Sequence, residues 1–336
     1  MAETRHPPDR LIVFGDHGIN FAGMLLDAFA TEASRREDVQ LVAVCDTALK
    51  PLPNRAIDSF SRRLRGAAMR FFNAGHPGPP SENLLIRAAS RHRLSLVAPP
   101  ERNINHPRFL QTVREEFRAN LALSVGCLQI FKPELLDCFQ MAVNFHDGLL
   151  PDYKGRGATA WSLYRRESSS GYTFHRMDAG IDTGPMLRQG SILLQHGMIA
   201  SEAAIAKVAL ATQDAGRVLD LMRERAAGTP QTESGSSFSA RDRRLIVRIE
   251  APSALSADEL LHRLRAFPIL TLQIAGRWYR VTALEECSGA PALSFATSDG
   301  RRLVPTRCMF LPPWLHRLYR IMKRALGSLR HLSSQG

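Results

Sequence analysis

The sequence is poor in the features that build disulfide frames and membrane spans. Five cysteines are scattered over 336 residues, without a Cys-x-x-Cys pair, at positions 45, 127, 138, 287 and 308. An odd number of thiols inside apolar segments favours reduced, buried cysteines over a disulfide framework or a zinc site. No apolar run approaches the ~18 residues that a transmembrane helix needs. The opening MAETRHPPDR is polar and includes acids, unlike a secretory signal, so we expect a cytoplasmic protein with no transmembrane segment.

Lysine is scarce although the chain is basic. The net charge is +12, yet only five of the 44 basic residues are lysine. Positive charge attracts phosphate-bearing or acidic partners over a long range. A bias this strong toward arginine equally reflects genomic base composition, so the charge is weak evidence for an RNA partner.

Apolar runs and helical patterns alternate through the first two thirds of the chain. Short apolar runs at residues 10–15, 40–45, 94–98, 121–125 and 141–145 predict strands, whereas residues 24–33 and 82–93 have helical spacing. This alternation predicts an α/β fold with a Rossmann-like, mainly parallel sheet that binds ligands at the carboxyl ends of its strands. Two further strands are expected at 172–177 and 191–194, followed by a helix that ends near residue 225.

The last third of the chain has a different pattern. The segment 228–237, GTPQTESGSS, is typical of a linker. Ser256 and Glu259 form a capping box at the start of a helix, and short strands are predicted at 244–250, 270–274, 278–284, 292–296 and 302–305. We therefore expect a Rossmann-like domain over 1–227, a linker at 228–237, a small β-rich C-terminal domain over 238–312 and a basic amphipathic tail helix at 313–336.

Two polar residues flank one aromatic at the end of the strand predicted at 141–145. Residues i and i+2 of a strand project to the same side, so Asn144 and His146 face one site while Phe145 points into the core. Taken singly, an Asn or His at a strand end is more typical of a cap or turn.

Two long strings carry a resemblance to a known family. They are NFHDGLLPDYKG at 144–155 and GYTFHRMDAGIDTGP at 171–185. They resemble the strings N-x-H-x-S-L-L-P-x-x-x-G and G-x-T-x-H-x-M-D-x-G-x-D-T-G of the folate-dependent formyltransferases, which serve one-carbon metabolism. The resemblance covers most of residues 10–225, and the β-rich remainder is similar to the C-terminal domain of methionyl-tRNA and some sugar formyltransferases. Two such strings in the same order are a specific signal. They favour a functional role for these residues over the alternative that each is an isolated cap.

The resemblance implies a catalytic trio and a formyl donor. The trio is Asn144, His146 and Asp182, and the donor is 10-formyltetrahydrofolate; no metal is required. The implied cofactor-binding residues are Ser124, Gly126, Leu128, Ile130, Asp178 and Gly180. For His175 the resemblance implies a supporting role, and a half-buried histidine bonded to backbone explains the position equally well.

The chemistry implied by the resemblance gives each member of the trio a task. A neutral amine attacks the formyl carbon, and N–H groups of Asn144 and His146 stabilise the charge that grows on the formyl oxygen. The Asp182 carboxylate favours the imidazolium form of His146 and, directly or through a water, receives the proton of the attacking nitrogen. Gly180 and Gly184 are expected to take positive φ, so that their loop approaches a flat ligand closely.

Departures from the family pattern bear on the acceptor. Gly148 stands where the family usually has serine, and both the segment 155–161 and the turn at 15–18 differ from those of tRNA-modifying members. An ordinary βα turn explains 15–18 as well as a phosphate cradle does. We expect the acceptor to be a small-molecule primary amine or hydroxylamine, such as an amino sugar or an amino-acid derivative. Methionyl-tRNA is the alternative, followed by hydrolysis of the donor and by a non-catalytic folate- or RNA-binding regulator.

Two basic segments have no assigned role. In the insert at 50–75 and the tail at 314–332, arginines are interleaved with apolar residues at helical spacing. For the insert, a helix that covers the sheet and has a solvated arginine face is the preferred interpretation over an RNA-binding loop. For the tail, docking on the protein, contact with acidic lipid and contact with RNA stay open.

Overall fold

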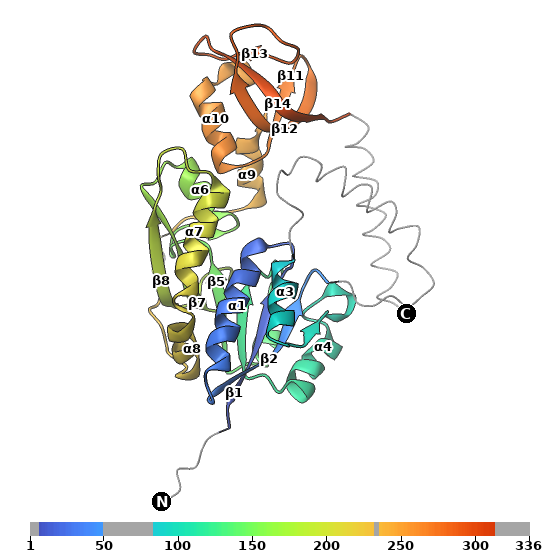
Figure 1. The fold of residues 1–336 in the computed structure, drawn as a ribbon, viewed down its shortest axis with the longest axis vertical. Helices are drawn as coiled ribbons and strands as arrows, with labels where there is room; N and C mark the ends of the chain where they lie inside the picture. The colour runs from blue at the N-terminus through green and yellow to red at the C-terminus, as the bar shows by residue number, and fades with distance from the viewer. Residues whose placement is uncertain (1–6, 50–82, 232–234, 313–336) are drawn as a thin grey trace, which may run out of the picture. The chain divides into compact units, whose positions relative to one another are not determined.

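The computed structural model describes residues 7–49, 83–231 and 235–312 (Figure 1). The chain divides into two compact units between Ala240 and Arg241. The basic insert at 50–75 and the tail at 314–332 lie outside the described residues. Within the described ranges, no helix is both long and apolar enough to cross a membrane.

A seven-stranded sheet forms the centre of the first unit and confirms the predicted α/β class. The strand order is β3-β2-β1-β4-β5-β7-β8, with β1 to β5 parallel and β7 and β8 antiparallel. The strands of the parallel part are near-continuous apolar runs, as expected where both faces of a sheet are covered. The strands are β1 (Asp9–Gly15), β2 (Val39–Asp46), β3 (Leu96–Val97), β4 (Leu121–Val125), β5 (Met141–His146), β7 (Ser169–Arg176) and β8 (Met186–Leu193).

Alternate residues of the strands supply two separate cores. On β1, Leu11 and Val13 belong to one apolar cluster, whereas Ile12 and Phe14 belong to the other. The first cluster packs under α1 (Asn20–Ser34), α3 (Leu84–Arg91), α7 (Ala200–Thr212) and α8 (Ala215–Arg223), which lie along one face of the sheet in Figure 1. The second packs under α4 (Pro107–Gln111), a π-helical turn (Thr112–Glu116) and α5 (Pro133–Leu136). A short 3₁₀ turn (Pro100–Arg102) precedes α4.

The helix predicted to run to residue 225 is interrupted. It is two helices, α7 and α8, separated at Gln213 and Asp214. The Asp214 carboxylate accepts hydrogen bonds from the Tyr172 hydroxyl at 2.6 Å and from Arg188 Nε at 2.9 Å. These bonds hold the interruption between α7 and α8 against β7 and β8. The apolar spacing of the sequence alone does not reveal this interruption.

In the segment expected to form a linker, the described residues 228–231 and 235–237 make ordered contacts within the first unit. Thr229 and Met186 exchange two backbone hydrogen bonds of 2.8 Å. Further on, β9 (Ser237–Phe238) pairs in parallel with β6 (Lys154–Gly155). The Phe238 ring stacks on Trp161 of α6 (Ala158–Tyr164), with ring centroids 4.3 Å apart. The described residues on either side of 232–234 are therefore packed on the first unit rather than free of it.

The second unit has its own sheet and its own core, as expected for a small β-rich domain. The sheet order is β10-β11-β12-β14-β13, and α10 (Ala257–Ala266) packs against it, with Ser256 Oγ accepting from the Glu259 N–H at 3.2 Å. The elements are β10 (Arg248–Ile249), a 3₁₀ turn (Pro252–Ala254), β11 (Leu270–Ile274), β12 (Arg277–Glu286), β13 (Phe295–Ala296) and β14 (Arg302–Phe310).

Two sequence-based expectations are wrong in detail. Residues 244–250 were expected to be a strand, but α9 (Ala240–Val247) is helical and only Arg248 and Ile249 pair with β11. Leu245 is 70% exposed, so no buried face enforces the strand period, and the arginine-rich start has good helix propensity. The cysteines are all free, as expected, but only Cys45 is buried; Cys308 is exposed, and the others, at 127, 138 and 287, are partly exposed.

Candidate active site

Asn144 and His146 project from the same face of β5. Nearer the start of the strand, that face is covered by the second apolar cluster. On β5, Ala142 belongs to that second core, whereas Val143 and Phe145 belong to the first. The alternation therefore places Asn144 and His146 together on one face, as predicted. Register adds polar neighbours, because Asn144 lies beside Ser124 of β4 and opposite His175 of β7.

The Asp182 carboxylate joins these side chains from a loop that follows β7. Its Oδ2 lies 3.4 Å from His146 Nδ1, and its Oδ1 lies 3.4 Å from His175 Nε2 and 3.5 Å from Asn144 Nδ2. The Gly155 N–H donates to Oδ2 at 2.8 Å. The structure thus brings Asn144, His146 and His175 each within 3.5 Å of the Asp182 carboxylate.

The surroundings of Asp182 keep its carboxyl ionised. Burial raises the pKa of this carboxyl, but the contact with His175, the imidazole charges and the Gly155 N–H outweigh burial and hold the pKa below its ordinary value of 3.8. At neutral pH the site therefore holds an anion between two imidazole rings.

His175 fixes the orientation of the Asn144 amide. Its Nδ1 lies 2.8 Å from the Arg176 carbonyl oxygen, which only accepts, so Nδ1 carries a proton. Nε2 lies 3.1 Å from Asn144 Nδ2 and 3.4 Å from Asp182 Oδ1, so it accepts from the amide when the ring is neutral and donates to the carboxylate when the ring is protonated. In this arrangement the amide nitrogen, rather than its oxygen, faces His175 and Asp182.

His146 is engaged differently from the sequence expectation. Its Nε2 donates to the Tyr153 carbonyl oxygen at 2.8 Å, while Nδ1 faces Asp182. Both ring nitrogens therefore meet acceptors of the protein itself, and neither N–H is aimed at open space. Donation to a bound carbonyl requires the ring to give up one of these partners.

The loop after β4 presents apolar side chains beside the polar centre. Ser124 is buried at the carboxyl end of β4, and Gly126 has φ +79°. Leu128 and Ile130, on the same loop, are 58% and 63% exposed, and Ile181, next to Asp182, is 60% exposed. Large exposed apolar side chains on two loops that flank a polar centre are suited to a flat, partly apolar ligand.

The Asp182 loop is held by its own side chains rather than by glycine φ angles. Asp178 Oδ1 accepts from the Gly180 N–H at 3.0 Å and from the Thr183 hydroxyl at 2.7 Å. The expectation of positive φ at Gly180 and Gly184 is wrong; the positive φ, +54°, belongs to Asp182 itself. Gly184 is needed for space, because a Cβ there would lie 2.0 Å from the Arg176 carbonyl oxygen.

Gln231 is a site-supporting residue that the sequence analysis missed. Its Nε2 donates to the carbonyl oxygens of Asp182 and Gly184, both at 2.8 Å. It lies in the polar segment 228–237, whose composition signals only a linker.

Gly148 also has a structural reason. A Cβ at this position would lie 2.8 Å from His146 Nε2 and 2.7 Å from the Ala158 Cβ of α6. Gly148 therefore lets α6 approach the strand end that carries His146, and a serine in its place requires a different packing of α6.

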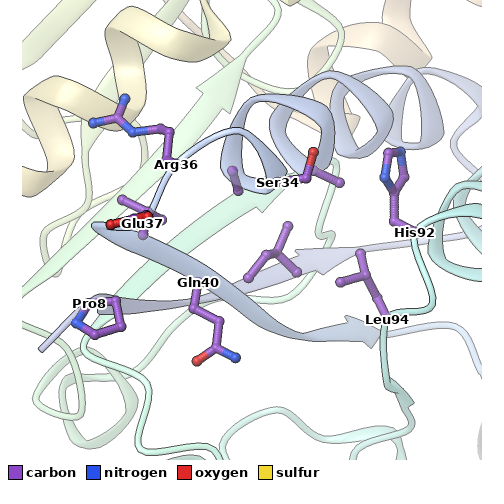
Figure 2. Close-up of a pocket in the computed structure, with 11 residues that line it drawn as sticks. Pro8, Ser34, Arg36, Glu37, Gln40, His92 and Leu94 are labelled. Atoms are coloured by element: carbon purple, nitrogen blue, oxygen red, sulfur yellow. The ribbon is translucent and has the colours of Figure 1, made fainter.

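A cavity of about 480 Å³ lies elsewhere, at the amino ends of β1 and β2 (Figure 2). It includes none of the predicted site residues. Its lining residues are Pro8, Ala30, Ala33, Ser34, Arg36, Glu37, Val39, Gln40, Leu41, His92 and Leu94. Within the described ranges, no cluster of three His, Cys, Asp or Glu side chains is arranged to hold a metal ion.

Comparison with known proteins bears on the segment that holds the site. The formyl transferase family model matches residues 81–215, which include Asn144, His146 and Asp182. The match covers 135 of the 336 residues, and over this segment the chain is similar to that family. Over 124 residues the chain is 34% identical to a methionyl-tRNA formyltransferase of Trichodesmium erythraeum (strain IMS101). That match covers 37% of this chain and 36% of the relative, so the chain spans about a third of the length of this curated relative.

Solved formyltransferases share the fold. An X-ray structure of a sugar N-formyltransferase from a Shewanella species has a TM-score of 0.54 at 16% identity, covering 83% of this chain and 97% of that one. An N-formyltransferase from Helicobacter canadensis, crystallised with folinic acid and dTDP-3-aminofucose, has a TM-score of 0.53 at 16% identity, covering 89% and 98%. At this identity the likeness shows the fold alone.

Proposed function

We propose that the chain is an N-formyltransferase that moves a formyl group from 10-formyltetrahydrofolate to a primary amine or hydroxylamine. The observation that carries the proposal is the convergence of Asn144, His146 and Asp182 on one face of the sheet, with contacts of 3.4–3.5 Å to the Asp182 carboxylate. An amide, an imidazole and a carboxylate together supply hydrogen-bond donors and a proton acceptor, which acyl transfer to an amine requires.

The residues around the trio fit the folate donor. Leu128, Ile130 and Ile181 offer exposed apolar surface on the two loops beside the polar centre. The Helicobacter canadensis relative was crystallised with folinic acid, which is a folate. When bound, the donor supplies a formyl group at an amide nitrogen.

Each member of the trio acts at a defined atom. Asn144 Nδ2 donates toward the formyl oxygen, where negative charge develops as the acceptor nitrogen adds to the carbon. His146 supports the same oxygen once its ring releases the Tyr153 carbonyl. Asp182, ionised at neutral pH, accepts the proton that the acceptor nitrogen loses, and that proton is returned to the departing nitrogen as its bond to carbon breaks.

The acceptor that we propose first is a small metabolite amine, such as an amino sugar or an amino-acid derivative. The fold shared with the sugar N-formyltransferase of the Shewanella species and the departures at 155–161 support it. Methionyl-tRNA is the second candidate, because the curated relative at 34% identity is a methionyl-tRNA formyltransferase.

The first test measures transfer directly. The purified chain is incubated with 10-formyltetrahydrofolate and a panel of amino sugars, amino-acid derivatives and charged initiator tRNA, while folate absorbance reports loss of the formyl group. We expect turnover with at least one amine and loss of turnover by ~10²–10³-fold in Asn144→Ala or His146→Ala.

A matched histidine variant controls for general damage. His92 lines the cavity at the opposite edge of the sheet, where it contacts Asp27 at 2.9 Å. His92→Ala should keep the wild-type kcat. Loss of formyl without any acceptor would favour a hydrolase, and folate binding without turnover in any mixture would overturn the proposed function. Transfer to tRNA alone would reverse the ranking of acceptors.

A further inference from the structure

A lysine is buried completely behind the strand end that carries His146. Lys207 projects from α7, and its side chain is 0% exposed. Its Nζ donates to the backbone carbonyl oxygen of Asp147 and lies 3.3 Å from the Ser170 hydroxyl of β7. Asp147 directly follows His146 at the end of β5. The ammonium group therefore sits one residue behind the catalytic imidazole.

The lysine belongs to a polar network that ties four elements together. The Asp147 carboxylate accepts from the Thr159 hydroxyl at 2.8 Å, and the Ser162 hydroxyl of α6 donates to Ser170 at 2.9 Å. Lys207 thus links α7 to β7, to α6 and to the turn after β5. Because Asp147 is bonded at its carbonyl and at its carboxylate, the direction in which the chain leaves His146 is held from two sides.

Burying an ammonium group costs several kcal/mol unless partners compensate it, and an apolar residue of similar volume often serves packing better. Val208 and Ala211 on the same helix already supply apolar contacts to the core. The charged group therefore needs a reason beyond filling space. The contacts offer two reasons: the ammonium charge balances the Asp147 carboxylate, and its hydrogen bond controls the Asp147 backbone next to His146.

We propose that Lys207 is a positioning residue for the reaction: its buried ammonium group holds the Asp147 carbonyl and so fixes the strand end from which His146 meets Asp182. This inference rests on the proposed formyl transfer. A displacement of about 1 Å at a reacting group lowers kcat ~10²-fold, and the contact of 3.4 Å between His146 Nδ1 and Asp182 Oδ2 has little tolerance.

The protonation of Lys207 falls in a measurable range. Burial lowers the pKa of this ammonium group from 10.5 to about 8, with the Asp147 carboxylate opposing the shift. The charged and titratable groups that face it are Asp147 directly and His146 beyond it; its other contacts are the Ser170 hydroxyl and a backbone carbonyl. A neutral amine still donates to the carbonyl, but more weakly, because a charge-assisted hydrogen bond is about twice as strong as a neutral one.

The pH dependence of stability distinguishes a positioning role of Lys207 from a purely stabilising one. Between about pH 8 and the ordinary value of 10.5, the unfolded chain binds a proton at Lys207 that the folded chain does not. Titration of this group therefore makes the folded state more stable as pH rises through that window. If Lys207 positions His146, kcat falls over the same window, so activity and stability move in opposite directions.

The experiment compares wild type, Lys207→Met and a matched control, Val208→Ala. Val208 is the next residue of α7 and is buried in the first core, so its truncation loosens the helix without touching Asp147. At pH 7 we expect Lys207→Met to lower kcat ~10–100-fold with KM for both substrates nearly unchanged. The ratio of wild-type to Lys207→Met kcat should shrink toward one by pH 9.5, while Val208→Ala keeps the wild-type kcat.

Each outcome decides the proposal. A wild-type kcat that stays flat or rises from pH 7 to 9.5, or a pH profile that is unchanged in Lys207→Met, overturns it. An equal loss of kcat in Val208→Ala shows a merely structural effect and also overturns it. If Lys207→Met does not fold, thermal melts and kcat of the wild type alone still decide, because activity that follows stability contradicts positioning. Absence of transfer by the wild type with every acceptor is a different result, which overturns the proposed function itself.

Discussion

At the scale of single residues, the site is held by side chains in unusual but well-supported states. Asp182 has a φ of +54°, a region that aspartate tolerates better than most residues but that still costs free energy. The loop pays that cost through the Gly155 N–H on its carboxylate and Gln231 on its carbonyl. The result is a carboxylate pinned between His146 and His175, oriented before any ligand arrives.

Gly148 gives a prediction at this scale. Gly148→Ala forces a methyl group to within 3 Å of His146 and Ala158, so we expect a loss of about 1–3 kcal/mol in the free energy of unfolding. The imidazole should also shift, and kcat should fall. Denaturant unfolding and the transfer assay measure the two effects.

The matched control is Gly216→Ala on α8, where a Cβ would make an ordinary contact of 3.4 Å with Glu32. Its free energy of unfolding should change by no more than about 0.5 kcal/mol. Equal stability and activity in both variants would show that Gly148 does not hold α6 close to His146.

At the scale of elements, sequence patterns predicted those parts of the site whose positions follow from the strand period. The i, i+2 rule placed Asn144 and His146 on one face, and the structure agrees. No local sequence pattern predicted the contacts that form between segments far apart in the sequence. Gln231 sits in a polar segment that reads as a linker, and Lys207 sits on an apolar helix face where only the fold shows its partner. The same limit explains why α9 was predicted to be a strand. Its residues alternate between polar and apolar, but they have no sheet to pair with.

The trio could be predicted only from the two strings that resemble the family, not from strand geometry. Nothing local in the sequence brings Asp182 back over β5; the loop returns because the Met177 N–H bonds the Ala142 carbonyl oxygen at 2.8 Å and because Asp178 orders the turn. The engagement of His146 with the Tyr153 carbonyl was likewise beyond sequence reasoning, since it depends on how the turn after β5 folds back.

At the scale of the whole molecule, each unit has a core of its own, and the first one ends beyond the composition break at residue 227. Two truncations test this. A chain that ends after Ala240 keeps the two backbone hydrogen bonds of Thr229, the contacts of Gln231 with the Asp182 loop and the stacking of Phe238 on Trp161. A chain that ends after Ala227 loses all three. At about 1 kcal/mol for each hydrogen bond, the shorter chain should melt roughly 5–10 °C lower than the longer one. Equal melting temperatures would show that residues 228–240 contribute nothing to the first unit.

The most direct test of the central claim is a double-mutant cycle on kcat with Asn144→Ala, Asp182→Asn and the combined variant. If these side chains act as one unit on the formyl group, each single change lowers kcat ~10²–10³-fold and the double variant loses little more than the worse single. Losses that multiply, as they do for independent sites, would contradict the account.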